Sequence, residues 1–226
     1  MAFAFLLLLI GAAVFGPSLW VKAVMARHAK DRPDFPGTGG ELARHLLDEG
    51  GLQEVAVEIT DMGDHYDPEA RAVRLSKENH DGRSLTAAVI AAHEVGHALQ
   101  DRDGYRPHVT RQRLVKATIG LQRVGSIIAL ASPLFGLLSR SPLVMLGVIG
   151  LGILSMASRV VVHLATLPVE FDASFGRALP ILEQGRYLPQ SDMPAARRIL
   201  RAAALTYVAG SLASLLNLWQ WIRVLR

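Results

Sequence analysis

The stretch Ala92-His93-Glu94-Val95-Gly96-His97-Ala98 carries the pattern H-E-x-x-H. On a helix, residues four apart differ by about 40° in direction and about one turn in height, so His93 and His97 point the same way and can hold one metal ion. Glu94 is rotated by about 100° from His93, which sets its carboxylate beside the metal, where it can take a proton from water. We therefore predict a catalytic Zn²⁺ site with His93 and His97 as ligands and Glu94 as general base.

The residues around this pattern favour a buried helix. Ser84 is a good N-cap, residues 85–92 are apolar and rich in alanine, and Gly104 suits the exit of a helix. Two histidines and a glutamate in such a helix are costly to bury unless something binds them. The alternative is a chance match, in which two histidines are packed in a core and the glutamate lies on the surface.

Composition points to a membrane protein. Hydrophobic residues make up 50% of the 226 residues, and the net charge is +4. The basic residues lie beside apolar stretches and form no patch with interleaved aromatic residues, so we expect a lipid bilayer as partner and no nucleic acid. The chain has no cysteine. A zinc ion must therefore be held by histidine and carboxylate side chains.

Four apolar stretches predict the membrane topology. Residues 2–21 read as a retained anchor, because the basic residues follow the apolar run. Residues 117–138 and 143–157 predict a helical hairpin, which spans the bilayer or enters it only in part, and residues 202–222 predict a last span. The expected fold class is a mainly α membrane protein with about four transmembrane helices and a small α+β zinc-peptidase domain containing a short β-hairpin. The expected divisions are an anchor at 1–22, a cytoplasmic metallopeptidase domain at 23–116, a transmembrane hairpin at 117–160, a cytoplasmic segment at 161–201 and a final transmembrane helix at 202–226.

The segment before the H-E-x-x-H helix has its own pattern. Residues 41–49 predict an amphipathic helix, 54–60 and 71–75 alternate as strands do, and 61–68 are rich in turn residues. The strand at 71–75 lies shortly before the metal helix. Its edge could pair with an extended substrate, or the two strands could form an ordinary structural hairpin.

Two residues compete for the place of third zinc ligand. Asp103 lies six residues after His97, but that layout needs glycine at the third position after the histidine, and Gln100 stands there. Glu170 follows Pro168, which fits the first turn of a new helix. Two membrane crossings after the metal helix would return the chain to the face that it left, so Glu170 is the preferred ligand. The alternative is an acidic residue that stabilises a helix N-terminus.

Several of these segments together resemble a known family. Residues 64–68, 73–76, 91–100, 167–174 and 202–208 are similar to the bacterial neutral zinc metallopeptidase family of multi-pass membrane proteins. More distantly, Glu170-Phe171-x-Ala173 resembles the E-F-x-A-D motif of the prenyl-protein and heat-shock membrane zinc proteases. The resemblance implies that Glu170 is the third ligand. It also marks a departure, because the final aspartate of that motif, which supports a ligand histidine, is Ser174 here.

These observations predict a membrane-embedded zinc endopeptidase of the bacterial inner membrane, with its site facing the cytoplasm and a protein or peptide as substrate. Membrane protein partners or a homo-oligomer are compatible with the sequence. Two other functions stay open, namely an intramembrane-cleaving zinc protease and a non-catalytic metal-binding membrane scaffold. His163 is a candidate to support the metal site. The candidates for stabilising the oxyanion of the reaction are His65, Tyr66, Tyr105 and His108.

Overall fold

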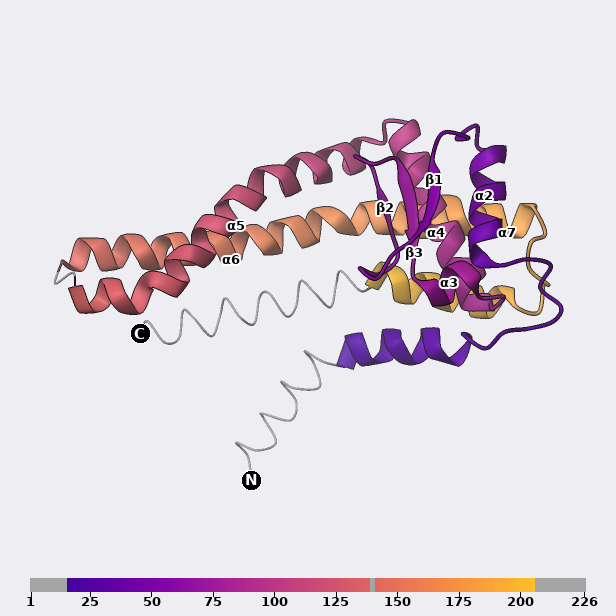
Figure 1. Ribbon diagram of the computed structural model, residues 1–226, viewed down its shortest axis with the longest axis horizontal. Helices are drawn as coiled ribbons and strands as arrows, with labels where there is room; N and C mark the ends of the chain where they lie inside the picture. Colours follow the sequence, from indigo (N-terminus) through magenta and orange to yellow (C-terminus); the bar gives the residue numbers. More distant parts are fainter. Residues whose placement is uncertain (1–15, 139–140, 206–226) are drawn as a thin grey trace, which may run out of the picture.

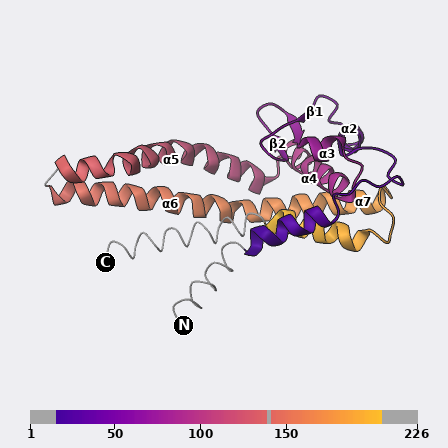
Figure 2. The ribbon, with the colours of Figure 1, turned by 60° about the horizontal axis from the view of Figure 1, so that its bottom comes forward.

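The computed structural model describes residues 16–138 and 141–205, and it divides into a head and an arm (Figure 1). The head contains a small sheet, several short helices and the helix with the H-E-x-x-H pattern. The arm is a long hairpin of two helices that projects from the head, and Figure 2 shows the same arrangement after a 60° rotation. The head is where the segments before and after the arm meet.

The sheet of the head has three strands in the order β1-β3-β2. Strand β1 (Ala56–Ile59) pairs in parallel with β3 (Ala72–Leu75), and β2 (His65–Asp67) pairs antiparallel with the other edge of β3. The prediction of strands near 54–60 and 71–75 is confirmed, but their pairing as a hairpin is wrong. The turn-rich stretch after β1 contains the additional strand β2, so β3 is central, and β1 and β2 are the two edge strands.

Short helices surround this sheet. Helix α2 (Gly39–Glu49) begins at Thr38, whose hydroxyl accepts a hydrogen bond from the Glu41 backbone while the Glu41 side chain accepts one from the Thr38 backbone. Helix α3 (Lys77–Asp81) follows β3 directly. An unlabelled helix over residues 16–27 packs against the core through the buried residues Val21 and Val24.

Helix α4 (Leu85–Arg102) is the centre of the head, and residues 85–100 are all buried. The Ser84 hydroxyl accepts a hydrogen bond from the Ala87 backbone at 3.1 Å, so the predicted N-cap is confirmed. At the other end Gly104 has a φ of 60°, which glycine adopts without strain. Small side chains such as Ala91 and Ala92 let neighbouring elements approach this helix closely.

The arm consists of α5 (Arg106–Leu138) and α6 (Pro142–Phe171), and α6 returns the chain to the head (Figure 1). There it continues as a π-helix, η1 (Asp172–Ala178), and then as α7 (Leu179–Gln184). Pro168 lies inside α6, so the prediction that a new helix begins there is wrong. A further helix begins at residue 193 and continues to residue 205, the last of the described residues.

The predicted fold class is wrong in its number of transmembrane helices. Within the described residues, one continuous helical segment, Leu146–Gln184, is long and apolar enough to cross a membrane. The apolar stretch at 117–138 is not a separate span but the distal part of α5, a helix that begins in the head with Arg106, Arg111 and Arg113. Most of the predicted anchor at 1–22 and of the predicted last helix at 202–226 lies outside the described residues.

Candidate metal centre

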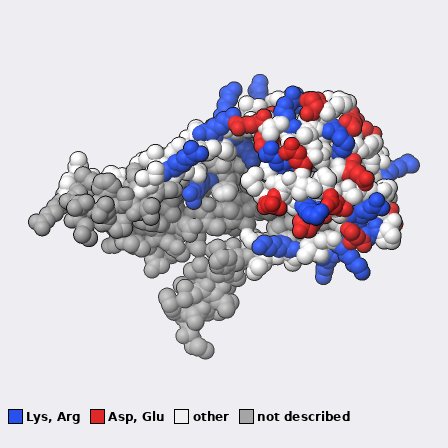
Figure 3. Space-filling model, viewed as in Figure 1, with Lys and Arg blue, Asp and Glu red and all other residues white. Residues whose placement is uncertain are grey.

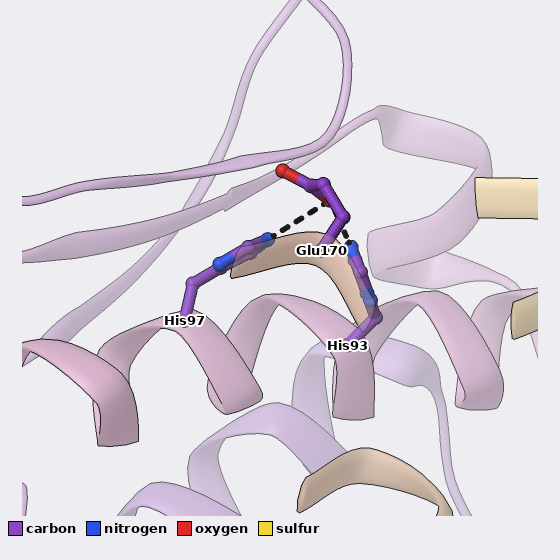
Figure 4. Close-up of side chains that lie close together, drawn as sticks. All are labelled: His93, His97 and Glu170. Carbon is purple, nitrogen blue, oxygen red and sulfur yellow. Dashed lines mark ion pairs between the residues drawn. The ribbon is translucent and has the colours of Figure 1, made fainter. Parts of the chain in front are cut away.

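Three side chains from two distant parts of the chain converge in the head (Figure 4). His93 and His97 lie one turn apart on α4, and Glu170 comes from the end of α6. The Nε2 atoms of His93 and His97 lie 3.3 Å and 3.4 Å from the same carboxylate oxygen, Oε2 of Glu170. All three side chains are buried. Glu170 is thus the acidic residue that reaches the histidine pair.

The two nitrogen–oxygen distances fit a tetrahedral ion. Ligand atoms held about 2.05 Å from one zinc ion at tetrahedral angles are roughly 3.3 Å apart, close to both observed nitrogen–oxygen distances. The second oxygen of Glu170, Oε1, is buried without a hydrogen-bond partner among the described residues. A buried carboxylate oxygen without a donor is costly, and a cation would satisfy it. The donor set of two imidazoles and one carboxylate is also one that zinc accepts.

A serine fixes the ring of His93. The Nδ1 atom of His93 lies 3.1 Å from the Ser174 hydroxyl, which donates its own proton to the Leu200 carbonyl at 3.3 Å. Because that proton is committed, the hydroxyl accepts a hydrogen bond from Nδ1–H of His93. The proton of the neutral ring therefore sits on Nδ1, and the lone pair of Nε2 points at the site.

A glutamine does the same for His97. The Nδ1 atom of His97 lies 3.0 Å from Oε1 of Gln100, and Nε2 of Gln100 donates to the Val169 carbonyl and to Asp172, both at 2.8 Å. With both of its N–H groups donated, Gln100 presents only its oxygen to His97. The same side chain ties α4 to the end of α6, so it orients one predicted ligand and holds the segment that carries another.

Close packing of α4 on η1 brings Glu170 into place. A Cβ atom at Gly96 would lie 2.8 Å from the Ala173 carbonyl oxygen, so only glycine allows this approach. A second contact joins these elements, because Arg177 of η1 donates to Asp172 at 2.9 Å and to Asp103, which caps α4, at 2.6 Å. The short π-helix directly after Glu170 is a geometry that occurs often at functional sites.

Glu94 lies in the wall of a cleft beside the three converging side chains. Its side chain is buried, and this burial raises the pKa of its carboxyl, although His93 and His97 act in the opposite direction. A raised pKa suits a carboxylate that must first accept a proton and later return it. The role of Glu94 as general base stays a prediction.

The cleft has a volume of about 440 Å³. Residues of β2 and the loops around it, of α4 and of the first turns of α5 contribute to its lining. Its lining includes all three residues of the edge strand β2. The α5 residues that line the cleft follow helical spacing and are His108, Arg111, Gln112, Val115, Lys116 and Ile119.

The other predicted candidates divide into those that line the cleft and those that do not. Asp103 caps α4 and pairs with Arg102 and Arg177, so it lies away from the histidine pair. Tyr105 packs under the Arg177 guanidinium. His163 lies on α6 and does not line the cleft. The three candidates that do line it are His65, Tyr66 and His108.

These three differ in what their polar atoms contact. The Tyr66 hydroxyl donates to Asp101 at 3.0 Å, and Nδ1 of His65 lies 2.8 Å from the Gly63 carbonyl. Nε2 of His108 lies 2.6 Å from the amide nitrogen of Gln112, and its Nδ1 is buried without a hydrogen-bond partner among the described residues. Burial, with the nearby His97 and Arg111, lowers the pKa of His108 to about 4, so its ring is neutral at neutral pH.

Gln100 and Asp172 were not predicted as parts of the site. A partial signal for Gln100 existed, because it lies three residues after His97 and therefore on the same side of α4. No signal in the sequence places Asp172 beside it, since that contact needs the return of α6.

Comparison with known proteins agrees with this geometry. Residues 3–226 match the family described as "Putative neutral zinc metallopeptidase". The chain belongs to this family. It is 37% identical over 218 residues to a Bacillus subtilis (strain 168) protein named "Putative membrane protease YugP", covering 94% of this chain and 93% of that relative. No solved structure matches the chain. Zinc is the metal of the family, and the group formed by His93, His97 and Glu170 could bind it.

Proposed function

We propose that this chain is a membrane-attached zinc endopeptidase in which His93, His97 and Glu170 hold the metal and Glu94 is the general base. The observation that carries the proposal is the convergence of both Nε2 atoms on one Glu170 oxygen in the wall of a cleft. Zinc held there would supply the Lewis acidity that makes water nucleophilic at neutral pH. Family membership supports the same reaction.

In this proposal, Glu94 transfers protons, and Ser174 and Gln100 orient the two histidines. Glu94 takes a proton from the attacking water and returns it to the leaving amine. Ser174 and Gln100 keep the two imidazoles in the tautomer whose Nε2 lone pair faces the metal. Ser174 and Gln100 are both neutral. The three ligands would therefore carry a single negative charge, that of Glu170.

His108 is the best placed donor for the oxyanion of the reaction. A hydrogen bond from the Gln112 amide to Nε2 leaves the proton of the neutral ring on Nδ1, which has no acceptor among the described residues. Tyr66 is already committed to Asp101. A buried donor without an acceptor is the state expected of a group whose acceptor forms only during the reaction.

The edge strand β2 is the proposed binding site for the substrate main chain. Its three residues line the cleft, and its partner β3 occupies only one of its sides. An extended peptide could therefore pair with β2. The central strand β3, predicted for this role, is unsuited to it because both of its edges are paired.

We further propose that the arm inserts in the inner membrane and that the head lies in the cytoplasm. The candidate helical segment Leu146–Gln184 is only 12% buried in its apolar window, so its apolar surface faces outward. Figure 3 shows acidic and basic residues together on the head, and Lys and Arg also on the part of the arm next to it. Basic residues at that end favour a cytoplasmic head, and a relative is named a membrane protease.

Two features weigh against the alternatives. The cleft carries charged side chains such as Asp67, Glu69 and Lys116, which do not suit a site within the bilayer interior. A scaffold without activity would not need an intact Glu94 beside the metal ligands.

The test is peptide hydrolysis by the purified full-length protein in detergent, measured together with its zinc content. The wild type should contain zinc and cleave an unfolded protein, whereas Glu94→Gln should retain zinc and lose at least about 100-fold in rate. The exposed Glu78→Gln, on α3, is the matched control and should behave as wild type. Undiminished hydrolysis by Glu94→Gln would end the proposed mechanism, and zinc binding without any hydrolysis would favour the scaffold.

A further inference from the structure

The first turns of α5 line the cleft, and the same helix continues into the apolar part of the arm. The α5 residues that form its wall extend from His108 to Ile119, and Ile119 lies only four residues before Arg123. No charged residue occurs from 124 to 138 on α5 or from 142 to 158 on α6. If the arm enters lipid, as proposed above, Arg123 and Arg159 mark the level at which it does so.

Arg123 on α5 and Arg159 on α6 lie at nearly the same height along the hairpin. A Cβ atom at Gly125 would lie 2.5 Å from the Ser155 hydroxyl, so residues 125 and 155 face each other across the antiparallel hairpin. Two residues back on α5 is Arg123, and four residues on along α6 is Arg159. Both arginines, which are exposed, therefore lie within about one helical turn of the same height.

The height of the metal centre above this level follows from the helical rise. The rings of His97 and His108 are 6.2 Å apart, so His108 is close to the height of the centre. His108 precedes Arg123 by 15 residues, about 22 Å of helix, and Glu170 follows Arg159 by 11 residues, about 16 Å. An extended chain rises about 3.3 Å per residue, so about five to seven substrate residues would cover this distance.

We infer that the cleft takes the segment of a membrane-anchored polypeptide that directly adjoins its anchor, with the scissile bond about five to seven residues from the lipid boundary. This inference rests on the proposed function. The lining of the cleft supports it, because the α5 residues near the metal centre include Arg111 and Gln112, whereas the last lining residue towards the apolar part of the arm, after Lys116, is Ile119. A segment leaving a membrane anchor has its more apolar residues at that same end.

The test uses hydroxamate probes, which bind a catalytic zinc ion without the need for a known cleavage sequence. Peptide spacers of two to twelve residues carry a hydroxamate at one end and a palmitoyl chain at the other, in both chain directions. A matched series carries acetyl in place of palmitoyl. Zinc-loaded full-length protein is reconstituted in phosphatidylcholine vesicles, and each probe displaces a fluorescent short hydroxamate.

In one chain direction, the palmitoyl series should bind most tightly at about five to seven spacer residues and roughly tenfold more weakly at two, because short probes cannot reach the metal. The acetyl series should show no such optimum. Ile119→Asp should weaken binding of the best palmitoyl probe, whereas Met62→Asp, the same kind of change at an exposed position outside the cleft, should not.

The failures of the two proposals are distinguishable. Binding of the palmitoyl series that is independent of spacer length in both directions, with normal binding of the acetyl series, would overturn the inference and leave the metal centre intact. A zinc-loaded protein that binds neither series would overturn the proposed function, and this inference with it.

Discussion

The Nδ1 atom of His93 lies 3.1 Å from the hydroxyl of Ser174, a contact between residues 81 positions apart. Ser174 stands where the motif of the prenyl-protein and heat-shock membrane zinc proteases has an aspartate. The histidine is therefore supported by a neutral oxygen, and the single proton of the Ser174 hydroxyl is donated to the Leu200 carbonyl. This relationship explains how the site tolerates the departure from that motif, and it leads to the first prediction.

Ser174→Ala should lower zinc affinity by roughly 10- to 100-fold, because Nδ1–H of His93 loses its acceptor and the ring is no longer held. Competition with a zinc chelator measures the effect. Ser158→Ala is the matched control, since among the described residues that buried serine bonds to the carbonyl of Ser155 on its own helix. Equal affinities for both variants would show that Ser174 does not position His93.

Gln100→Leu should lower both zinc affinity and stability. The change preserves volume but removes one donor each from the Val169 carbonyl and the Asp172 carboxylate. It also leaves the buried Nδ1–H of His97 without its acceptor, which costs about 1–3 kcal/mol. Thermal unfolding in detergent and chelator competition report the two effects separately. Gln53→Leu, at an exposed position, should change neither. A stable Gln100→Leu protein with full zinc affinity would contradict the proposed support of His97.

Glu170→Gln should lose most of the bound zinc, because an amide oxygen lacks the charge that a divalent ion requires of its third ligand. Zinc is measured by metal analysis after purification. Circular dichroism serves as the check on folding, since the segment is buried in the head. A folded variant with a full complement of zinc would remove Glu170 from the metal centre.

Gly96→Ala should destabilise the head by about 1–3 kcal/mol, because the added methyl group would lie 2.8 Å from the Ala173 carbonyl oxygen and would push η1 away from α4. Zinc content should fall with it, since Glu170 moves with η1. At Gly120 on α5 nothing lies within 4 Å of the added atom, so Gly120→Ala should be neutral or slightly stabilising. Thermal unfolding compares the two.

His108→Phe should lower kcat for peptide hydrolysis by roughly 100- to 1,000-fold with little change in KM or zinc content, as expected for a group that acts in the transition state. His65→Phe should have a smaller effect on kcat, since His65 lies on the edge strand near the substrate main chain. The reverse ranking would assign the oxyanion donor to His65.

Part of the site follows from local periodicity. The four-residue repeat of a helix places His93 and His97 together whatever the rest of the fold does, and Ser84 and Gly104 set the ends of that helix. The short strands were also predictable from alternation. Their pairing was not, because a parallel arrangement of β1 and β3 depends on contacts between residues distant in the chain.

By itself, then, the sequence determined a helix that offers two imidazoles and one glutamate, together with the family to which such a chain belongs. Tertiary structure decided the rest: the Glu170 oxygen between both rings, the supports from Gln100 and Ser174, and the edge strand that lines the cleft. It also corrected the expected number of membrane helices in the described residues. The physical reason is that a local pattern fixes the direction of a side chain along its own helix, whereas the partner of that side chain is fixed by packing between α4 and the end of α6.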